Sequence, residues 1–153
     1  ATNPGGDQII PAPEALSQKV QKDLGGSWEE FYAPLMFSDP KNAKAYLERV
    51  KNAQMASEIP KTKGESTQAK VAHQFAFADV EREKTRYEAL PTIKARTLLI
   101  TGEDDQLTKP ENAKRVEERI PAADLHIIAD SGHAVMFEKS EEVTRLVKDF
   151  LKD

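Results

Sequence analysis

The chain of 153 residues contains no cysteine. Disulfide bonds, thiolate zinc sites and a cysteine nucleophile are therefore all excluded. An absence of cysteine fits the cytoplasm, where disulfides rarely form, and we expect a cytoplasmic protein.

Long hydrophobic runs are also missing. Stretches such as Thr97-Leu98-Leu99-Ile100-Thr101 are far shorter than the roughly 20 apolar residues that a membrane-spanning helix needs. The 22 basic residues are spread along the chain instead of forming a stripe, and the net charge is −4, so no feature indicates nucleic-acid binding. We therefore expect a protein that binds neither membranes nor nucleic acids.

Residues 11–90 show helical patterns, and we predict an all-helical unit over this range. Ser27-Trp28-Glu29-Glu30 is a capping box, and Asp39-Pro40 combines an N-cap residue with a proline in the first turn. Further helices are predicted over residues 71–76 and 82–90, the second ended by Pro91. The apolar residues at helical spacing, which we expect to be core, are Trp28, Phe31, Tyr32, Leu35 and Met36 in one helix and Ala43, Tyr46, Leu47, Val50 and Ala53 in the next.

From residue 95 the pattern changes to strand, helix, strand, helix. Residues 97–101 and 124–129 predict two parallel strands, and Thr108-Lys109-Pro110-Glu111 is a capping box that opens the helix between them. Apolar residues at 143, 146, 147, 150 and 151 predict a closing amphipathic helix. The fold class is therefore α/β. Because two parallel strands do not make a closed architecture, we expect the C-terminal βαβα part of a larger sheet.

An acidic residue and a histidine follow the two predicted strands. The first strand ends in Thr101-Gly102-Glu103-Asp104-Asp105, and the second is followed by Asp130-Ser131-Gly132-His133. In an open parallel sheet, ligand chemistry gathers beyond the carboxyl ends of the strands. Asp105 and His133 are therefore the candidate catalytic residues, because an acid can orient an imidazole and stabilise its charged form beside a serine nucleophile. Asp104 competes for the acid position, and Glu103 and Asp130 are expected to be solvated.

These two loops resemble those of the α/β-hydrolase family, in which G-x-x-D follows one strand and S/G-G-H follows the next. Asp105 is the third residue after Gly102, which puts it in the acid position, and His133 lies 28 positions later. The order of acid before histidine matches the Ser…Asp…His order of that fold. The resemblance is specific over residues 97–151.

The resemblance also divides the chain. It implies that residues 1–10 are the exit from a core strand, residues 11–90 a helical cap, and residues 91–153 the C-terminal part of the core. The opening Ala1-Thr2-Asn3-Pro4-Gly5-Gly6 lacks an initiator methionine, and a Pro-Gly-Gly turn typically follows an ordered element. We therefore interpret the sequence as a fragment.

The nucleophile elbow of that family, G-x-S-x-G, is missing. Gly25-Gly26-Ser27-Trp28-Glu29 and Gly64-Glu65-Ser66-Thr67-Gln68 share only the first glycine, and neither follows a predicted strand. In the family the elbow precedes the cap, so the resemblance implies that a missing N-terminal half carried the serine. No cofactor is implied, and the chain alone is expected to be inactive.

The candidate residues also have structural interpretations. An acidic residue after a strand often fills a turn, and Gly-His before a helix can form only a tight turn; the matched positions of Asp105 and His133 favour catalysis. His126 lies in a strand pattern and is interpreted as a half-buried packing residue, and His73 as structural or solvated. The three histidines have no partner at i+3 or i+4, so no metal site is predicted. Met136 and Phe137 are expected to be pocket or core residues.

Three functions are consistent with this pattern. The leading hypothesis is part of a serine-type hydrolase that cleaves a small apolar ester, lactone or related acyl substrate. The alternative is a non-catalytic ligand receptor of the same fold, which a residue other than Ser, Asp or Cys at the centre of the elbow would favour. The third is an interaction module that self-associates through an unpaired sheet edge, which a folded monomer at high concentration would contradict.

Overall fold

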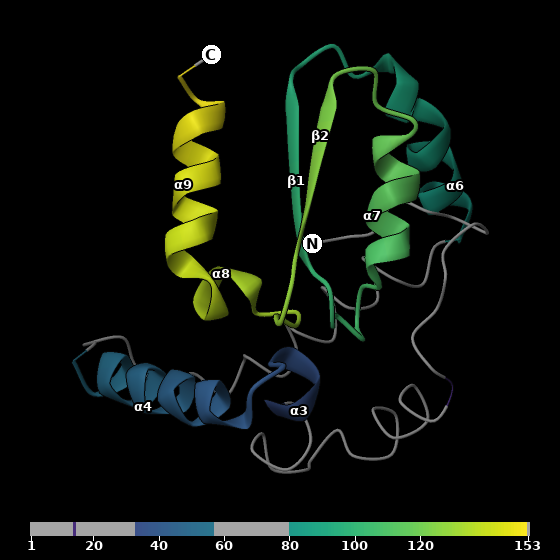
Figure 1. Ribbon diagram of the computed structural model, residues 1–153. Coiled ribbons are helices and arrows are strands. Elements are labelled where there is room, and N and C mark those ends of the chain that lie inside the picture. Colours follow the sequence, from purple (N-terminus) through teal and green to yellow (C-terminus); the bar gives the residue numbers. More distant parts are fainter. Residues whose placement is uncertain (1–13, 15–32, 57–79, 153) are drawn as a thin grey trace.

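The computed structural model describes residue 14 and residues 33–56 and 80–152 (Figure 1). The predicted capping box at Ser27, the predicted helix over residues 71–76, His73 and residues 1–10 lie outside these ranges. The elements described in full are the helices α3 (Ala33–Met36), α4 (Pro40–Ala56), α6 (Val80–Ala89), η2 (Leu90–Thr92), α7 (Pro110–Glu117), α8 (Val135–Glu138) and α9 (Ser140–Phe150), and the strands β1 (Thr97–Gly102) and β2 (Ala123–Ile128).

The sheet of the described residues consists of β1 and β2, which pair in parallel from Thr97 opposite Ala123 to Gly102 opposite Ile128. Helix α7 makes the crossover between them, as parallel pairing requires. The predicted order of strand, helix, strand and helix is confirmed, and so is the α/β class. Residues 97–100 of β1 are only partly buried, and only the last two residues of the strand are buried.

Helices cover both faces of this strand pair, with α6 and α7 on one side and α9 on the other (Figure 1). Leu90, Val116 and Ile120 form the buried cluster on the α7 side, and Leu99 of β1 packs against it. Each such side chain contributes about 1.5–3 kcal/mol when fully removed from water. On the other side α9 contacts β1, and the Arg96 guanidinium lies 4.5 Å from the centre of the Phe150 ring.

Helix α4 begins where the sequence predicts it. The Asp39 carboxylate accepts a hydrogen bond from the Lys41 amide at 2.8 Å, and Pro40 needs no amide partner. The rings of Phe37, Tyr46 and Phe137 then pack together, with centroid distances of 5.4, 5.9 and 5.5 Å. These contacts hold α4 against α8, at the end of the sheet where the strands finish (Figure 1).

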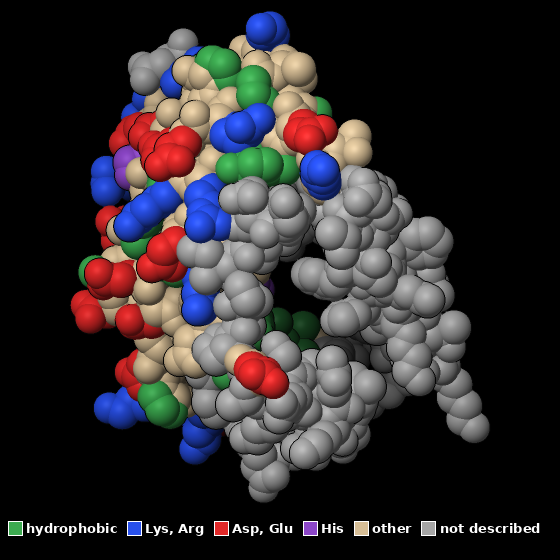
Figure 2. Space-filling view, turned by 90° about the vertical axis from the view of Figure 1, so that its right-hand side faces the viewer, with side chains coloured by type: hydrophobic (Ala, Val, Ile, Leu, Met, Phe, Trp, Pro, Cys, Tyr) green, Lys and Arg blue, Asp and Glu red, His purple; other side chains and the backbone are tan. Residues whose placement is uncertain are grey.

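The surface carries charges of both signs. Figure 2 shows one face of the molecule, and on the coloured part of it Lys and Arg side chains lie among Asp and Glu side chains. Helices in residues 33–56 and 80–152 all lack the combination of length and apolar character that crossing a membrane requires.

Candidate active site

The loops that follow β1 and β2 are joined by backbone hydrogen bonds. The Glu103 amide donates to the Ile128 carbonyl and the Asp104 amide to the Ser131 carbonyl, both at 2.9 Å. Gly102 permits this approach, because a Cβ there would collide with the carbonyl oxygens of Ser131 and Gly132. The glycine of the G-x-x-D pattern therefore brings the acid loop and the histidine loop together.

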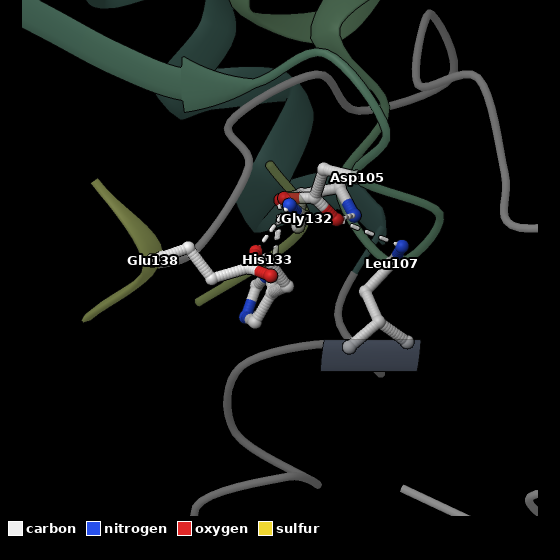
Figure 3. Close-up of polar contacts among 6 residues, drawn as sticks. Asp105, Leu107, Gly132, His133 and Glu138 are labelled. Atoms are coloured by element: carbon white, nitrogen blue, oxygen red, sulfur yellow. Dashed lines mark hydrogen bonds and ion pairs between the residues drawn. The ribbon is translucent and has the colours of Figure 1, made fainter. Parts of the chain in front are cut away.

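Asp105 and His133 meet at this junction. Nδ1 of the His133 ring lies 2.9 Å from Oδ2 of Asp105 (Figure 3), and the two side chains are 28% and 4% exposed respectively. Because an ionised carboxylate only accepts hydrogen bonds, Nδ1 carries the proton, and Nε2 of the neutral ring is an acceptor. Asp104, the competitor for the acid position, is exposed, as is Glu103. The geometry thus selects Asp105 over its neighbour.

The Asp105 carboxylate is satisfied by further donors. Its Oδ1 accepts the amides of Leu107 and Thr108 at 2.9 and 2.8 Å, and its Oδ2 accepts the Thr108 hydroxyl at 2.7 Å. Burial raises the pKa of this carboxyl, but the hydrogen bonds from His133 and Thr108 and the His133 charge together hold it below its ordinary 3.8. Asp105 is therefore ionised at neutral pH and can stabilise an imidazolium.

The predicted capping box at Thr108 is wrong. Helix α7 begins at Pro110, and its N-cap residue, Lys109, makes no side-chain capping bond. The Thr108 hydroxyl instead bonds to Asp105 and lies 3.3 Å from Nδ1 of His133. A hydrogen bond that a hydroxyl donates to a buried carboxylate is stronger than one that it accepts from an amide at the end of a helix. Water can satisfy the helix-end amide instead. Sequence reasoning therefore missed Thr108 as a partner of the acid.

We predict that Thr108→Val lowers the free energy of unfolding by about 1.5–3 kcal/mol, because a hydrogen bond to a buried charged group is lost while the shape is kept. Thr92→Val is the matched control, since the Thr92 hydroxyl donates to the Ala89 carbonyl in an exposed position. The control is expected to change stability by less than about 0.5 kcal/mol. Urea unfolding of both variants measures the difference, and equal effects would contradict this role of Thr108.

Glu138 is a second residue that sequence reasoning missed. Its Oε2 accepts the Gly132 amide at 2.7 Å, immediately before His133 (Figure 3). Burial raises the pKa of the Glu138 carboxyl, but the hydrogen bonds from Gly132 and from residues 38–42 hold it below its ordinary 4.5. The partners in residues 38–42 lie 96–100 positions away in the chain, so no local pattern could have indicated them.

The remaining histidine, the serine of the histidine loop and the residues that follow His133 make other contacts. The His126 side chain is 36% exposed on β2 and lies 3.3 Å from the Asp124 carboxylate. Ser131 is fully buried and donates to the Ile128 carbonyl at 2.8 Å, so it is not placed as a nucleophile. Phe137 is part of the packed aromatic cluster, whereas Met136 is 75% exposed and is therefore not a core residue. In residues 33–56 and 80–152 no group of three His, Cys, Asp or Glu side chains is arranged to hold a metal ion.

An acid and a histidine held together beyond the carboxyl ends of parallel strands are characteristic of enzymes that use a histidine as a base on an α/β scaffold. Residues 12–140 match the family described as the alpha/beta hydrolase fold. The chain belongs to this α/β-hydrolase family, which confirms the resemblance in the sequence.

Curated relatives are hydrolases. The chain is 30% identical to Lipase 1 of Psychrobacter immobilis over 72% of this chain and 31% of that protein. It is 31% identical to proline iminopeptidase PfmaB of Pestalotiopsis fici over 48% of this chain and 28% of that protein. It is 36% identical to a 2-hydroxy-6-oxononadienedioate/2-hydroxy-6-oxononatrienedioate hydrolase of Burkholderia vietnamiensis over 41% of this chain and 22% of that protein. The aligned part of the chain spans less than about a third of each relative's length.

Solved structures show the same fold. A 2-hydroxy-6-oxo-6-phenylhexa-2,4-dienoate hydrolase from Rhodococcus sp. strain RHA1 matches 95% of this chain with a TM-score of 0.71 and 16% identity, over 51% of its own length. Est816, described as an N-acyl homoserine lactone degrading enzyme, matches 97% of this chain with a TM-score of 0.61 and 24% identity, over 54% of its own length. The chain therefore spans about half of each of these structures.

Proposed function

We propose that this chain supplies the acid and the general base of a serine-type hydrolase, and that the nucleophile comes from residues outside the 153. The observation on which this rests is the 2.9 Å hydrogen bond between Asp105 and Nδ1 of His133. It leaves Nε2 as the basic atom on the opposite side of a ring that is 28% exposed. The proposed partner is a small-molecule substrate, and the chemistry needs no cofactor.

The proposed reaction is acyl transfer in two halves. His133 Nε2 takes the serine proton as the serine oxygen attacks the substrate carbonyl carbon, and Asp105 stabilises the imidazolium that forms. When the bond to the leaving group breaks, His133 gives this proton to the leaving alcohol. In the second half His133 takes a proton from water, which attacks the acyl-enzyme, and returns it to the serine. The ring is thus neutral again at the end of each cycle.

A small apolar ester or lactone is the substrate class that we propose. Relatives named as a lipase and structural neighbours named as an esterase and a lactone-degrading enzyme support acyl-bond cleavage. Residues 11–90 are proposed to be a helical cap. In this range α4 lies beyond the carboxyl ends of the strands (Figure 1). Sites between such layers are mostly apolar, which suits an uncharged acyl substrate.

The test is covalent labelling of the full-length protein with phenylmethylsulfonyl fluoride during hydrolysis of p-nitrophenyl acetate. We expect activity to disappear as one sulfonyl group is added, and peptide mass spectrometry to map that group to a serine upstream of this chain. The 153 residues alone are expected to show no turnover. A label on Ser27, Ser66 or Ser131, or undiminished activity after complete labelling, would contradict the proposal.

A further inference from the structure

Two hydrogen bonds donated by backbone amides hold the chain on either side of His133. Before it, the Gly132 amide donates to Oε2 of Glu138 at 2.7 Å. After it, the Ala134 amide donates to the Met36 carbonyl at 2.7 Å. The direction of the imidazole therefore depends on partners from α8 and from the end of α3, as well as on Asp105.

The second oxygen of Glu138 binds the segment that starts α4. Oε1 accepts the Ser38 amide at 3.0 Å, the Ser38 hydroxyl and the Asn42 side-chain amide at 3.1 Å, and the Asp39 amide at 3.3 Å. One carboxylate thus joins the histidine loop to the start of α4. Both of its oxygens face hydrogen-bond donors only. A carboxylate can accept at both oxygens, whereas a side-chain amide would present an NH2 donor on one side.

The same segment lies directly against the histidine loop. A Cβ on Gly132 would lie 2.9 Å from the Met36 carbonyl oxygen and 3.2 Å from the Ser38 nitrogen. The aromatic packing of Phe37 and Tyr46 against Phe137 adds an apolar contact between the same two segments. A shift of residues 36–42 would therefore be passed to Gly132 and to the histidine beside it.

We propose that Glu138 is a positioning residue for His133, which fixes the imidazole through Gly132 and couples its direction to the start of α4. This inference rests on the proposed function, because it assigns a role relative to His133 as the base. Glu138 does not touch the reacting atoms. Its effect is geometric, and a misplacement of a catalytic group by about 1 Å can cost about a hundredfold in rate.

The test is Glu138→Gln in the full-length protein. The glutamine keeps the shape, but its NH2 group must face either the Gly132 amide or the donors at residues 38–42, so one of the two attachments is lost. We expect kcat for p-nitrophenyl acetate to fall about 10- to 100-fold, with KM within about threefold of the wild-type value. We also expect the NMR resonance of the His133 Nδ1 proton to move or broaden. Neither change follows from a loss of stability in a protein that remains folded.

Glu142→Gln is the matched control. Glu142 lies on α9, its side chain is 47% exposed, and it lies 3.8 Å from the Arg145 guanidinium. This variant is expected to keep kcat within about twofold and to leave the Nδ1 proton resonance in place, because exposed ion pairs contribute little.

Three results would overturn the inference. The first is a Glu138→Gln variant with wild-type kcat and an unmoved Nδ1 resonance. The second is an increase in KM alone, which would limit the role to substrate binding. The third applies if Glu138→Gln does not fold. Asn42→Ala is then measured instead; it is expected to lower kcat about threefold at constant KM, and an unchanged kcat would overturn the inference.

The proposed function fails on a different result. Full activity of His133→Ala would refute it, while the Nδ1 resonance would still report whether Glu138 positions the ring.

Discussion

His133→Ala is expected to abolish hydrolysis of p-nitrophenyl acetate by the full-length protein, lowering kcat/KM by at least about a thousandfold. Alanine removes both Nε2, which would accept the serine proton, and Nδ1, which lies 2.9 Å from the Asp105 carboxylate. The Gly102 and Gly132 backbone contacts do not involve the imidazole, so the fold should be retained. Steady-state kinetics with circular dichroism of the same sample measure both quantities.

His126→Ala is the control for a histidine-to-alanine change. The His126 ring is 36% exposed on β2 and lies beside Asp124. Its loss is expected to alter kcat/KM by less than about twofold, as for most surface substitutions. Equal rates for His133→Ala and the wild type would remove His133 from the mechanism.

Asp105→Asn is expected to lower kcat about ten-thousandfold while the protein stays folded. Both carboxylate oxygens accept donors, so the asparagine NH2 group must face either His133 and Thr108 or the two loop amides. If it faces His133, the ring must accept at Nδ1 and carry its proton on Nε2. Nε2 then cannot take a proton from the serine, and the charge that stabilises the imidazolium is gone.

Asp104→Asn tests the same chemical change one position earlier. The Asp104 side chain is exposed, and its backbone amide bond to the Ser131 carbonyl survives the substitution. We expect kcat of this variant to stay within about twofold of the wild type. A larger loss in Asp104→Asn than in Asp105→Asn would transfer the role of the acid to Asp104.

Local patterns predicted the elements that build the site. The strands predicted over residues 97–101 and 124–129 both appear, with bounds that differ by at most one residue, and Asp39-Pro40 marks the start of α4. These predictions succeed because strand and helix patterns arise from neighbours within a few residues. The meeting of Asp105 and His133 was also predictable, since parallel strands bring their carboxyl ends to one edge.

The partners of that pair were not predictable from the same patterns. Thr108 fits a capping box, but the buried Asp105 carboxylate binds its hydroxyl instead. Glu138 lies in the four-residue helix α8, and the sequence around it does not indicate its hydrogen bonds with Ser38 and Asn42. A hydrogen bond between residues about a hundred positions apart depends on packing, which no single window of the sequence contains.

The sequence by itself thus determined the α/β class, the two strands and the acid and histidine that follow them. The G-x-x-D spacing already favoured Asp105 over Asp104, and only the tertiary structure showed that Thr108 and Glu138 hold the two members of the pair. The physical reason is the low tolerance of a buried carboxylate for unsatisfied oxygens. Asp105 is buried and Glu138 is partly buried, and both accept hydrogen bonds from donors that the fold brings near. No pattern in the sequence around either carboxylate indicates which donors these are.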